Sequence, residues 1–268
     1  MFIKLTDDLI TATIIILMFF AAVTIMYIIY SKNYDRQRKS GPHGKLKFFG
    51  QPQFDNQGKL LGYELLLREM NESGQWQVPW RPNLLTLKQF LDLMREAVRS
   101  IPKGQDVAVN LSKEQLLNPS FEPFIKSVIS INPDHQVVIE TDLSNLASRR
   151  EQALLQRIRS ARSLGAKLSV DSVGTTMKEY NQLNAFVGSI DYIKCSMDEY
   201  RKSTPDQWLD VNLGSWVAFA KQHGIVLVLA KVETGADYGL AKQLGINYVQ
   251  GYYTGKPMEI EDGVLADE

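Results

Sequence analysis

Cysteine and histidine are scarce in this sequence. Cys195 is the single cysteine among 268 residues, which excludes an intrachain disulfide framework and fits a reducing compartment. With three histidines and no cluster of cysteine and histidine, a structural zinc site is not expected. An excess of positive charge is also missing, because Lys plus Arg and Asp plus Glu number 30 each. A binder of polymeric nucleic acid needs a basic surface to displace counterions, so this class is excluded, whereas a small phosphate-bearing ligand needs only a few local cations.

One segment departs from this balanced composition. Residues 9–30 contain no charged side chain, and about 20 apolar residues suffice for a helix to cross the hydrocarbon core of a bilayer. A buried core helix and a cleaved signal peptide are the alternatives. A signal peptide has a shorter apolar run, whereas this run ends in Tyr27 and Tyr30, as an interfacial aromatic belt does. We therefore predict a single transmembrane helix at residues 9–30, preceded by a short extracytoplasmic tail at residues 1–8.

The flanking charges predict the orientation of this helix. Lys4, Asp7 and Asp8 precede it. The cations that follow it are Lys32, Arg36, Arg38, Lys39, Lys45 and Lys47. Because cations favour the cytoplasmic side, we predict a single-pass protein of the cell membrane with its N-terminus outside and its large domain in the cytoplasm. Residues 31–45 form a basic linker, which either rests against anionic membrane lipid or serves only as a stop-transfer flank.

From Leu46 onward, short apolar runs alternate with longer segments of helical period. Strands are predicted at Lys47–Gln53, Leu60–Arg68, Gln105–Asn110, Gln136–Glu140, Ala166–Asp171, Ile190–Lys194, Ile225–Leu229 and Gly245–Gln250. Helices are predicted at Leu84–Arg99, Asn145–Leu164, Trp208–Gln222 and Ala236–Leu244. Strands that alternate with helices indicate an α/β fold with a mostly parallel sheet. This number of strands favours a TIM-like (β/α)8 barrel over residues 46–262, followed by a tail at residues 263–268, and an open doubly wound sheet is the alternative.

Several predicted strands end on a polar residue after an apolar run. These residues are Asn110, Glu140, Asp171, Lys194 and Gln250. Helix caps favour Ser, Thr, Asp and Asn, so capping does not explain the Glu, Lys and Gln in this set. The strand ends of a barrel open onto one rim, where such folds build their sites. The sequence therefore predicts a functional site at this rim.

The residue types at the predicted rim suit a hard metal ion. Glu64 lies inside the apolar run GYELLLR, where a carboxylate needs either a solvent-facing rim or a cation. Together with Asn110, Glu140 and Asp171 it supplies four oxygen donors. Oxygen ligands without His or Cys select Mg²⁺, Mn²⁺ or Ca²⁺ over zinc. Four separate surface or capping groups are the alternative.

These residues occur in an ordered series of motifs that resembles the EAL domain family. GYELLLR is similar to the signature that names the family, with Leu65 in place of alanine, and GQPQFD at residues 50–55 resembles the strand before it. The later motifs, in family order, are VNLS at 109–112, the Glu140 segment, VDSVGT at 170–175, DYIK at 191–194, VET at 232–234 and VQGYYTGKPM at 249–258. EAL domains are (β/α) barrels, generally with one reversed strand, that bind cyclic di-GMP over two divalent metals and hydrolyse one phosphodiester.

The resemblance implies a role for each matching residue. Glu64, Asn110, Glu140 and Asp171 would hold the first metal, Mg²⁺ or Mn²⁺. Lys194 would stand beside the scissile phosphate or the attacking water, and Glu233 matches the second glutamate of the family segment EGVE. Gln51 and Gln250 would contact guanine or the adjacent phosphate network, and Arg68 would meet a phosphate or a backbone carbonyl.

Other positions depart from the family pattern. The paired aspartates appear as DSVGTT, with Ser172 in place of the second aspartate. EGVE appears as AKVE, with Ala230 in place of the first glutamate and Lys231 in place of the glycine. Leu143 stands where a second glutamate would anchor the loop after the paired aspartates. These changes remove carboxylates on the second-metal side, so the second metal site is doubtful and hydrolysis should be depressed.

Three functions follow from the resemblance and its departures. The first is a degenerate, membrane-anchored receptor or regulator that binds cyclic di-GMP with little or no hydrolysis. The second is an active phosphodiesterase that forms linear pGpG with a divalent metal. The third is a protein-interaction scaffold without a ligand. The resemblance also makes a homodimer plausible, and the output partner is unknown.

Overall fold

The computed structural model describes residues 16–21, 23–27, 44–79, 85–144, 148–201 and 209–260. The chain divides into two units, residues 1–43 and residues 44–268. Within the predicted span 9–30, residues 16–21 and 23–27 are helical. The rest of that span, the N-terminal tail, linker residues 31–43 and the C-terminal tail at 263–268 lie outside the described residues. Among the described residues, no helix has both the length and the apolar character that crossing a bilayer requires.

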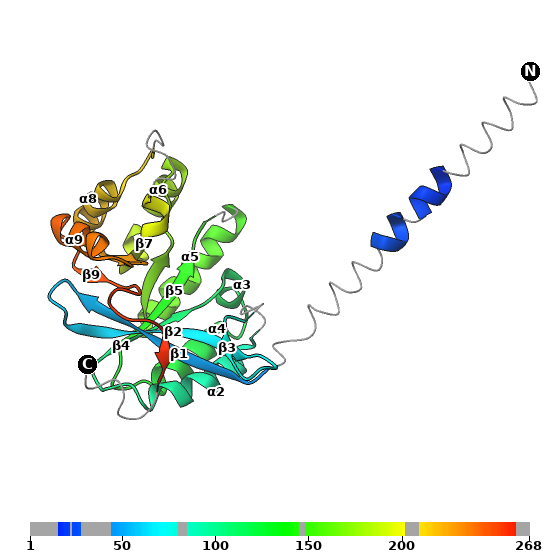
Figure 1. Ribbon diagram of the computed structural model, residues 1–268, viewed down its shortest axis with the longest axis horizontal. Helices are drawn as coiled ribbons and strands as arrows, with labels where there is room; N and C mark the ends of the chain where they lie inside the picture. Colours follow the sequence, from blue (N-terminus) through cyan, green and yellow to red (C-terminus); the bar gives the residue numbers. More distant parts are fainter. Residues whose placement is uncertain are drawn as a thin grey trace, which may run out of the picture. The chain divides into compact units, whose positions relative to one another are not determined.

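The second unit alternates strands with helices. In chain order its elements are β1 (Leu46–Asp55), β2 (Leu60–Met70), β3 (Trp76–Gln77), α2 (Leu87–Val98), β4 (Asp106–Asn110), α3 (Lys113–Leu116), α4 (Phe121–Ser130), β5 (Val137–Asp142), α5 (Ser148–Ser163), β6 (Lys167–Asp171), α6 (Met177–Asn184), η2 (Val187–Ser189), β7 (Tyr192–Ser196), α7 (Met197–Tyr200), α8 (Leu213–His223), β8 (Val226–Ala230), α9 (Gly235–Gln243), β9 (Tyr248–Val249) and β10 (Met258–Glu259). The helices lie around the outside of the strands (Figure 1).

The strands close into a barrel. The sheet order runs β10-β1-β9-β8-β7-β6-β5-β4-β2-β3, and β1 also pairs with β2, so eight strands form a closed ring with β3 and β10 added to its edge. Strand β1 is antiparallel to both of its ring neighbours, β2 and β9, while the other ring pairs are parallel. The predicted TIM-like (β/α)8 barrel with one reversed strand is therefore confirmed, and the open doubly wound alternative is wrong.

Alternation along the strands separates two environments. Val107, Val109 and Ile139 belong to the continuous apolar core of the domain. Residues between them in sequence face the other side of the sheet, because side chains of a strand alternate. That opposite face includes Glu140, which is buried at the level of Asn110 on the neighbouring strand. The lumen of the barrel therefore carries polar groups toward the rim, while the outer face of the strands packs against the helices.

Helix starts follow a common sequence rule at this rim. Thr86, Ser112, Thr176 and Thr234 each cap a helix with a capping box, in which the side chain three residues later bonds back to the cap. Three of these caps lie shortly after strands β4, β6 and β8 and so fix short connections near the strand ends. The predicted helix at Leu84–Arg99 begins at Leu87, because Thr86 caps it.

The predicted strand Gly245–Gln250 shortens to the two residues of β9, and the remaining boundary differences are smaller. Strands β5 and β7 continue two residues beyond Glu140 and Lys194, which leaves both residues on the predicted face. Helix α8 begins at Leu213, since Asn212 caps it, and residues 202–208 of the preceding segment lie outside the described residues. The sequence analysis missed the helices α3, α4, α6, η2 and α7 and the two-residue strands β3 and β10.

Candidate functional site

The predicted site residues share one face of the barrel wall. Glu64 pairs in register with Ala108, two residues before Asn110, and Asn110 pairs with Glu140. Asp171 pairs with Asp142, two residues after Glu140. Residues that pair in register, and residues two apart on one strand, face the same side of a sheet. Glu64, Asn110, Glu140 and Asp171 therefore point toward the lumen near one level, as the sequence predicted.

Lys194 lies at the centre of this group. Its Nζ donates to Glu64 Oε2 and to Glu140 Oε2, each at 2.7 Å. The side chains of Lys194, Glu64 and Glu140 are only 4, 9 and 3 % exposed. Asn110 Nδ2 donates to Glu64 Oε1 at 2.5 Å, so the amide oxygen of Asn110 stays available. Lys194, Glu64 and Glu140 thus form a buried network. The exposed Asn110 joins it through its amide, and Asp171 lies close enough to act on its charges.

The predicted nucleotide-contacting glutamines belong to the same network. Gln250 Nε2 donates to Glu64 Oε2 at 2.7 Å and to Gln51 Oε1 at 3.1 Å. Gln51 Nε2 in turn donates to the carbonyl oxygen of Gly255. Gln53 Nε2 donates to Gln250 Oε1 at 3.1 Å, so both the nitrogen and the oxygen of the Gln250 amide have hydrogen-bond partners. The two predicted glutamines therefore lie beside the quartet, which is Glu64, Asn110, Glu140 and Asp171. The amide of Gln250 orients Glu64, and Gln51 contacts Gln250.

The charges in this network do not cancel. Burial alone would raise the pKa of Glu64, but the charge and hydrogen bond of Lys194, with hydrogen bonds from Asn110 and Gln250, lower it to about 2. Burial and the nearby charge of Glu64 raise the pKa of Glu140 to about 8. Burial also raises the pKa of Asp171. Three carboxyl groups face one ammonium group, so one carboxylate is neutralised and the other two favour a proton or a further cation.

The excess negative charge of the three carboxyl groups over Lys194 bears on whether the quartet fits a divalent cation. Among the described residues, no three His, Cys, Asp or Glu side chains surround one point closely enough to hold an ion as they lie. In the quartet, Lys194 bridges Glu64 and Glu140. The donor set is nevertheless all oxygen, and its charge deficit after Lys194 equals that of one divalent cation. Glu64, Asn110, Glu140 and Asp171 therefore fit one hard divalent cation in chemistry and charge.

Two cavities open beside the quartet. The first, about 490 Å³, is lined by Asn110, Glu140 and Asp171 and by apolar groups that include Phe90. Arg68 lines it too; its Nη1 donates to the carbonyl oxygen of Leu67 at 2.9 Å. Arg68 therefore lies at the predicted rim but, unlike Gln51 and Gln250, makes no hydrogen bond within the buried network.

The second cavity, about 440 Å³, lies beside Glu64, Asp171, Lys194 and Gln250. The substituted residues Ser172, Ala230 and Lys231 line it as well. None of these three carries a carboxylate. Lys231 brings a positive charge to this side. The carboxylates of Asp198 and Glu233 also line the cavity, and each is paired with Arg201 or Lys231.

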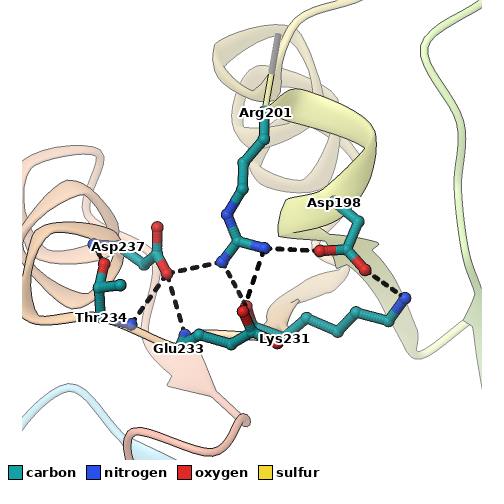
Figure 2. Close-up of polar contacts among 6 residues, drawn as sticks. All are labelled: Asp198, Arg201, Lys231, Glu233, Thr234 and Asp237. Carbon is teal, nitrogen blue, oxygen red and sulfur yellow. Dashed lines mark hydrogen bonds and ion pairs between the residues drawn. The ribbon is translucent and has the colours of Figure 1, made fainter. Parts of the chain in front are cut away.

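Glu233 lies outside the buried network. It follows β8 and lines the second cavity, and its Oε2 is 3.6 Å from Nη1 of Arg201. Arg201 also binds Asp198, Asp237 and the carbonyl oxygen of Lys231, as Figure 2 shows. The structure thus places the predicted catalytic residue Glu233 in a cluster of ion pairs around Arg201, on the same cavity as Lys194.

Some rim residues were missed by the sequence analysis. Gln53 carried a usable signal, since it lies two residues after Gln51 on β1 and so shares its face. Asp198 and Arg201 carried none, because a charged pair three residues apart after a strand reads as an ordinary solvent-facing turn of helix. Tyr252 was quoted within a motif but not singled out, and it lines the second cavity with an exposed ring.

The sequence and structure both match known proteins. The EAL domain family matches residues 35–257. The Escherichia coli strain K12 protein named Probable cyclic di-GMP phosphodiesterase PdeN is 24 % identical over 233 residues, which cover 80 % of this chain and 44 % of that protein. The chain spans less than half the length of the curated relatives it matches.

Solved structures share the fold. The PaMucR phosphodiesterase in complex with c-di-GMP has a TM-score of 0.64 and 22 % identity, over 80 % of this chain and 92 % of that one. The Bacillus subtilis YkuI protein, with an EAL domain and in complex with substrate c-di-GMP and calcium, has a TM-score of 0.66 and 19 % identity, over 82 % of this chain and 58 % of that one. The closed barrel, the ordered motifs and the family match agree. This chain belongs to the EAL domain family.

Proposed function

We propose that this chain binds cyclic di-GMP across the rim of its barrel as a receptor or regulator, with little or no hydrolysis. The observation that carries the proposal is the position of the four oxygen donors between two cavities of about 490 and 440 Å³, both of which Asp171 lines. A cyclic dinucleotide has two nucleosides whose riboses are joined by two phosphodiesters, so its phosphates suit the donors and one nucleotide suits each cavity. Each cavity also carries a cation, Arg68 in the first and Lys231 in the second.

One divalent cation, Mg²⁺ or Mn²⁺, belongs to this proposal. Glu64, Asn110, Glu140 and Asp171 would hold it, and it would supply positive charge to a bound phosphate. Lys194 would keep Glu64 ionised, and Gln250 would fix its orientation. The YkuI structure, which contains c-di-GMP and calcium, is compatible with the use of a divalent cation.

The second cavity argues against efficient hydrolysis. Hydrolysis of a phosphodiester with two metals uses ions about 3.5–4 Å apart, one for the attacking oxygen and one for the leaving oxygen. Ser172 and Ala230 offer a hydroxyl and a methyl group there, and Lys231 adds a positive charge. We therefore expect turnover to fall by several orders of magnitude, while binding keeps the quartet and two cations.

The test uses the full-length chain in mild detergent. Calorimetry with cyclic di-GMP and Mg²⁺ or Mn²⁺ measures binding, and chromatography of the same mixture measures the linear dinucleotide. We expect saturable binding of one ligand per chain without product. Binding should weaken at least tenfold in Arg68→Ala, because a charge-assisted contact to phosphate is worth about 1.5–3 kcal/mol. Steady formation of product would contradict the proposal that the chain is a receptor without hydrolysis. Absence of binding would contradict the proposal that cyclic di-GMP is its ligand.

An active phosphodiesterase is the second candidate. It is favoured by the presence of the complete quartet together with Lys194, Glu233 and Gln250. The third candidate, a scaffold without a ligand, gains nothing from the two open cavities beside the quartet. The chromatographic result separates the first two candidates, and calorimetry separates both from the third.

Anchoring in the cell membrane through residues 9–30, with the barrel in the cytoplasm, is a further part of the proposal. It is supported by the uncharged run and by the cations that follow it. Contact of the basic linker with lipid, a homodimer and an unidentified output protein are compatible with it. Recovery of the chain in a carbonate-resistant membrane fraction is the expected result, and recovery in the soluble fraction would contradict the anchor.

A further inference from the structure

Lys231 has an unusual backbone conformation for its residue type. Among the described residues, two other than glycine have a positive φ, Ser172 and Lys231, each at 54°. This left-handed conformation costs a residue with a side chain roughly 1–2 kcal/mol, whereas glycine adopts it freely. Both residues line the second cavity. Strain that the surroundings enforce at a cavity is a sign of function.

The surroundings of Lys231 do enforce this conformation. Arg201 Nη2 donates to the carbonyl oxygen of Lys231 at 3.1 Å and to Asp237 Oδ2 at 2.8 Å. Asp237 Oδ2 in turn accepts from the backbone N–H groups of Glu233 and Thr234. Figure 2 shows Arg201 between these groups, with the Lys231 side chain extended away from them toward Asp198. The backbone at Lys231 is therefore fixed, while its side chain extends over the surface to Asp198.

Hydrogen bonds to the segment that begins at Gln250 also hold the loop that contains Lys231 in place. The N–H of Val232 donates to the carbonyl oxygen of Gln250, and the N–H of Tyr253 donates to the carbonyl oxygen of Val232. Gly251 leaves the space for this approach, because a Cβ there would lie 2.1 Å from the carbonyl oxygen of Val232. Lys231 is thus held at a constant position relative to Gln250 of the buried network.

The ammonium group of Lys231 has a weak and replaceable partner. Its Nζ lies 2.5 Å from Asp198 Oδ2, and the two side chains are 57 and 45 % exposed. Exposed pairs of this kind contribute about 0–1 kcal/mol, so another anion can take the ammonium at little cost. Lys194, the other lysine among the described residues that line this cavity, is buried between Glu64 and Glu140 and has no such freedom.

The other charged groups around Lys231 allow its ammonium group to move from Asp198 to another anion. Asp198 is also bound by Arg201, whose Nη1 lies 2.5 Å from Asp198 Oδ1. Asp198 therefore keeps a cationic partner when Lys231 leaves. Glu233 already has Arg201 within 3.6 Å. The loss of Lys231 from Asp198 leaves no isolated charge in a buried place, which keeps the exchange inexpensive.

We propose that Lys231 is an anion-binding residue that rests on Asp198 in the free protein and transfers to a phosphate group of a ligand in the second cavity. In this arrangement Asp198 competes with the ligand for the same ammonium group. Lys231 supplies a cation on the side where Ser172 and Ala230 leave no ligands for a metal. The identity of the ligand, a phosphodiester, rests on the proposed function. Lys231 would also bind other phosphate anions.

Competition predicts effects of opposite sign from the two partners. The test is a double-mutant cycle in the full-length chain with Lys231→Gln, Asp198→Asn and both together. The probes are cyclic di-GMP with Mg²⁺ and inorganic pyrophosphate with a chelator, each titrated by calorimetry. We expect Lys231→Gln to weaken binding about tenfold and Asp198→Asn to tighten it about two- to fivefold. In the Lys231→Gln background, Asp198→Asn should change affinity less than about twofold.

Three further variants separate binding from folding. Lys231→Arg keeps the cation and should bind within about threefold of the parent protein. Lys231→Gly removes the cation and the backbone strain, so it should bind as weakly as Lys231→Gln while its unfolding midpoint stays equal or rises. Lys242→Gln is a matched control, because Lys242 lies on α9 over the ring of Tyr238 and does not line the cavity.

The outcomes distinguish this inference from the proposed function. Binding of pyrophosphate but not cyclic di-GMP, with the expected cycle, supports the role of Lys231 and contradicts the proposed ligand. Binding of cyclic di-GMP with no effect of Lys231→Gln overturns the role of Lys231 alone. An equal effect of Asp198→Asn with and without Lys231 also overturns it, because Asp198 would then act only as a local negative charge. If neither probe binds, the role of Lys231 and the proposed function are both overturned.

Discussion

Two groups of charged residues at the barrel rim contain the same chemistry in different surroundings. Around Lys194, the side chains of Glu64 and Glu140 are almost fully buried, at 9 and 3 % exposure. Around Arg201, the side chains of Asp198 and Lys231 are 45 and 57 % exposed. Both groups join cations to carboxylates over distances of 2.5–2.8 Å. Their short distances alone would suggest equal strength.

Burial separates the two groups in energy and in use. A buried charge that loses its partner keeps a large desolvation penalty, whereas an exposed one regains water. The Lys194 group is therefore a fixed element that can only accept a further cation. In the Arg201 group, Lys231 can leave Asp198 for another anion. One rim thus combines a rigid half, suited to a metal ion, with an adjustable half, suited to an anion.

The largest effect is expected from Lys194→Met, which tests the rigid half. Removal of the ammonium leaves Glu64 and Glu140 buried without a cation, so the free energy of unfolding in a chelator should fall by about 3–5 kcal/mol. Urea denaturation followed by circular dichroism measures this loss. Mn²⁺ should restore part of it, because the ion supplies charge to the same carboxylates. A loss below about 1 kcal/mol would show that the buried network is not coupled as the distances indicate.

A much smaller effect is expected from Arg201→Ala, which tests the adjustable half. Its ion pairs with Asp198 and Glu233 are largely exposed. The buried Asp237 keeps the hydrogen bonds from the backbone N–H groups of Glu233 and Thr234, so the free energy of unfolding should fall by only about 1–2 kcal/mol. The loss should shrink further at 1 M salt, where the Debye length is about 3 Å. The same denaturation experiment at low and high salt measures it. A salt-independent loss as large as that of Lys194→Met would remove the distinction between the two groups.

Sequence alone predicted the rigid half better than the adjustable half. Glu64, Asn110, Glu140, Asp171 and Lys194 each stand in or at the end of an apolar run, and the alternation of strands fixes the face on which they lie. An error of two residues at the ends of β5 and β7 left that face unchanged. The barrel followed from the alternation of strands with helices, and one reversed strand was expected only from the family resemblance. The short turn between β1 and β2 was a local signal for their antiparallel pairing that the sequence analysis did not use.

The adjustable half depends on contacts that no local pattern encodes. Arg201 reaches Asp237 across 36 residues of sequence, and Lys231 reaches Asp198 across 33. The positive φ of Lys231 is likewise set by Arg201 and by the packing of Gly251, not by its own preference. The sequence analysis noted Lys231 as a positive charge beside missing carboxylates. It had no means to place Asp198 or Arg201 next to it.

The central claim is that one side of the rim holds a metal ion and the other side uses Lys231 in place of one. Counting ions in the ligand-bound protein tests this most directly. Mn²⁺ titrated into the full-length chain with saturating cyclic di-GMP, and followed by electron paramagnetic resonance, should reach one tightly bound ion per chain with the spectrum of an isolated centre. Two bound ions with the exchange-coupled spectrum of a pair about 3.5–4 Å apart would contradict the account.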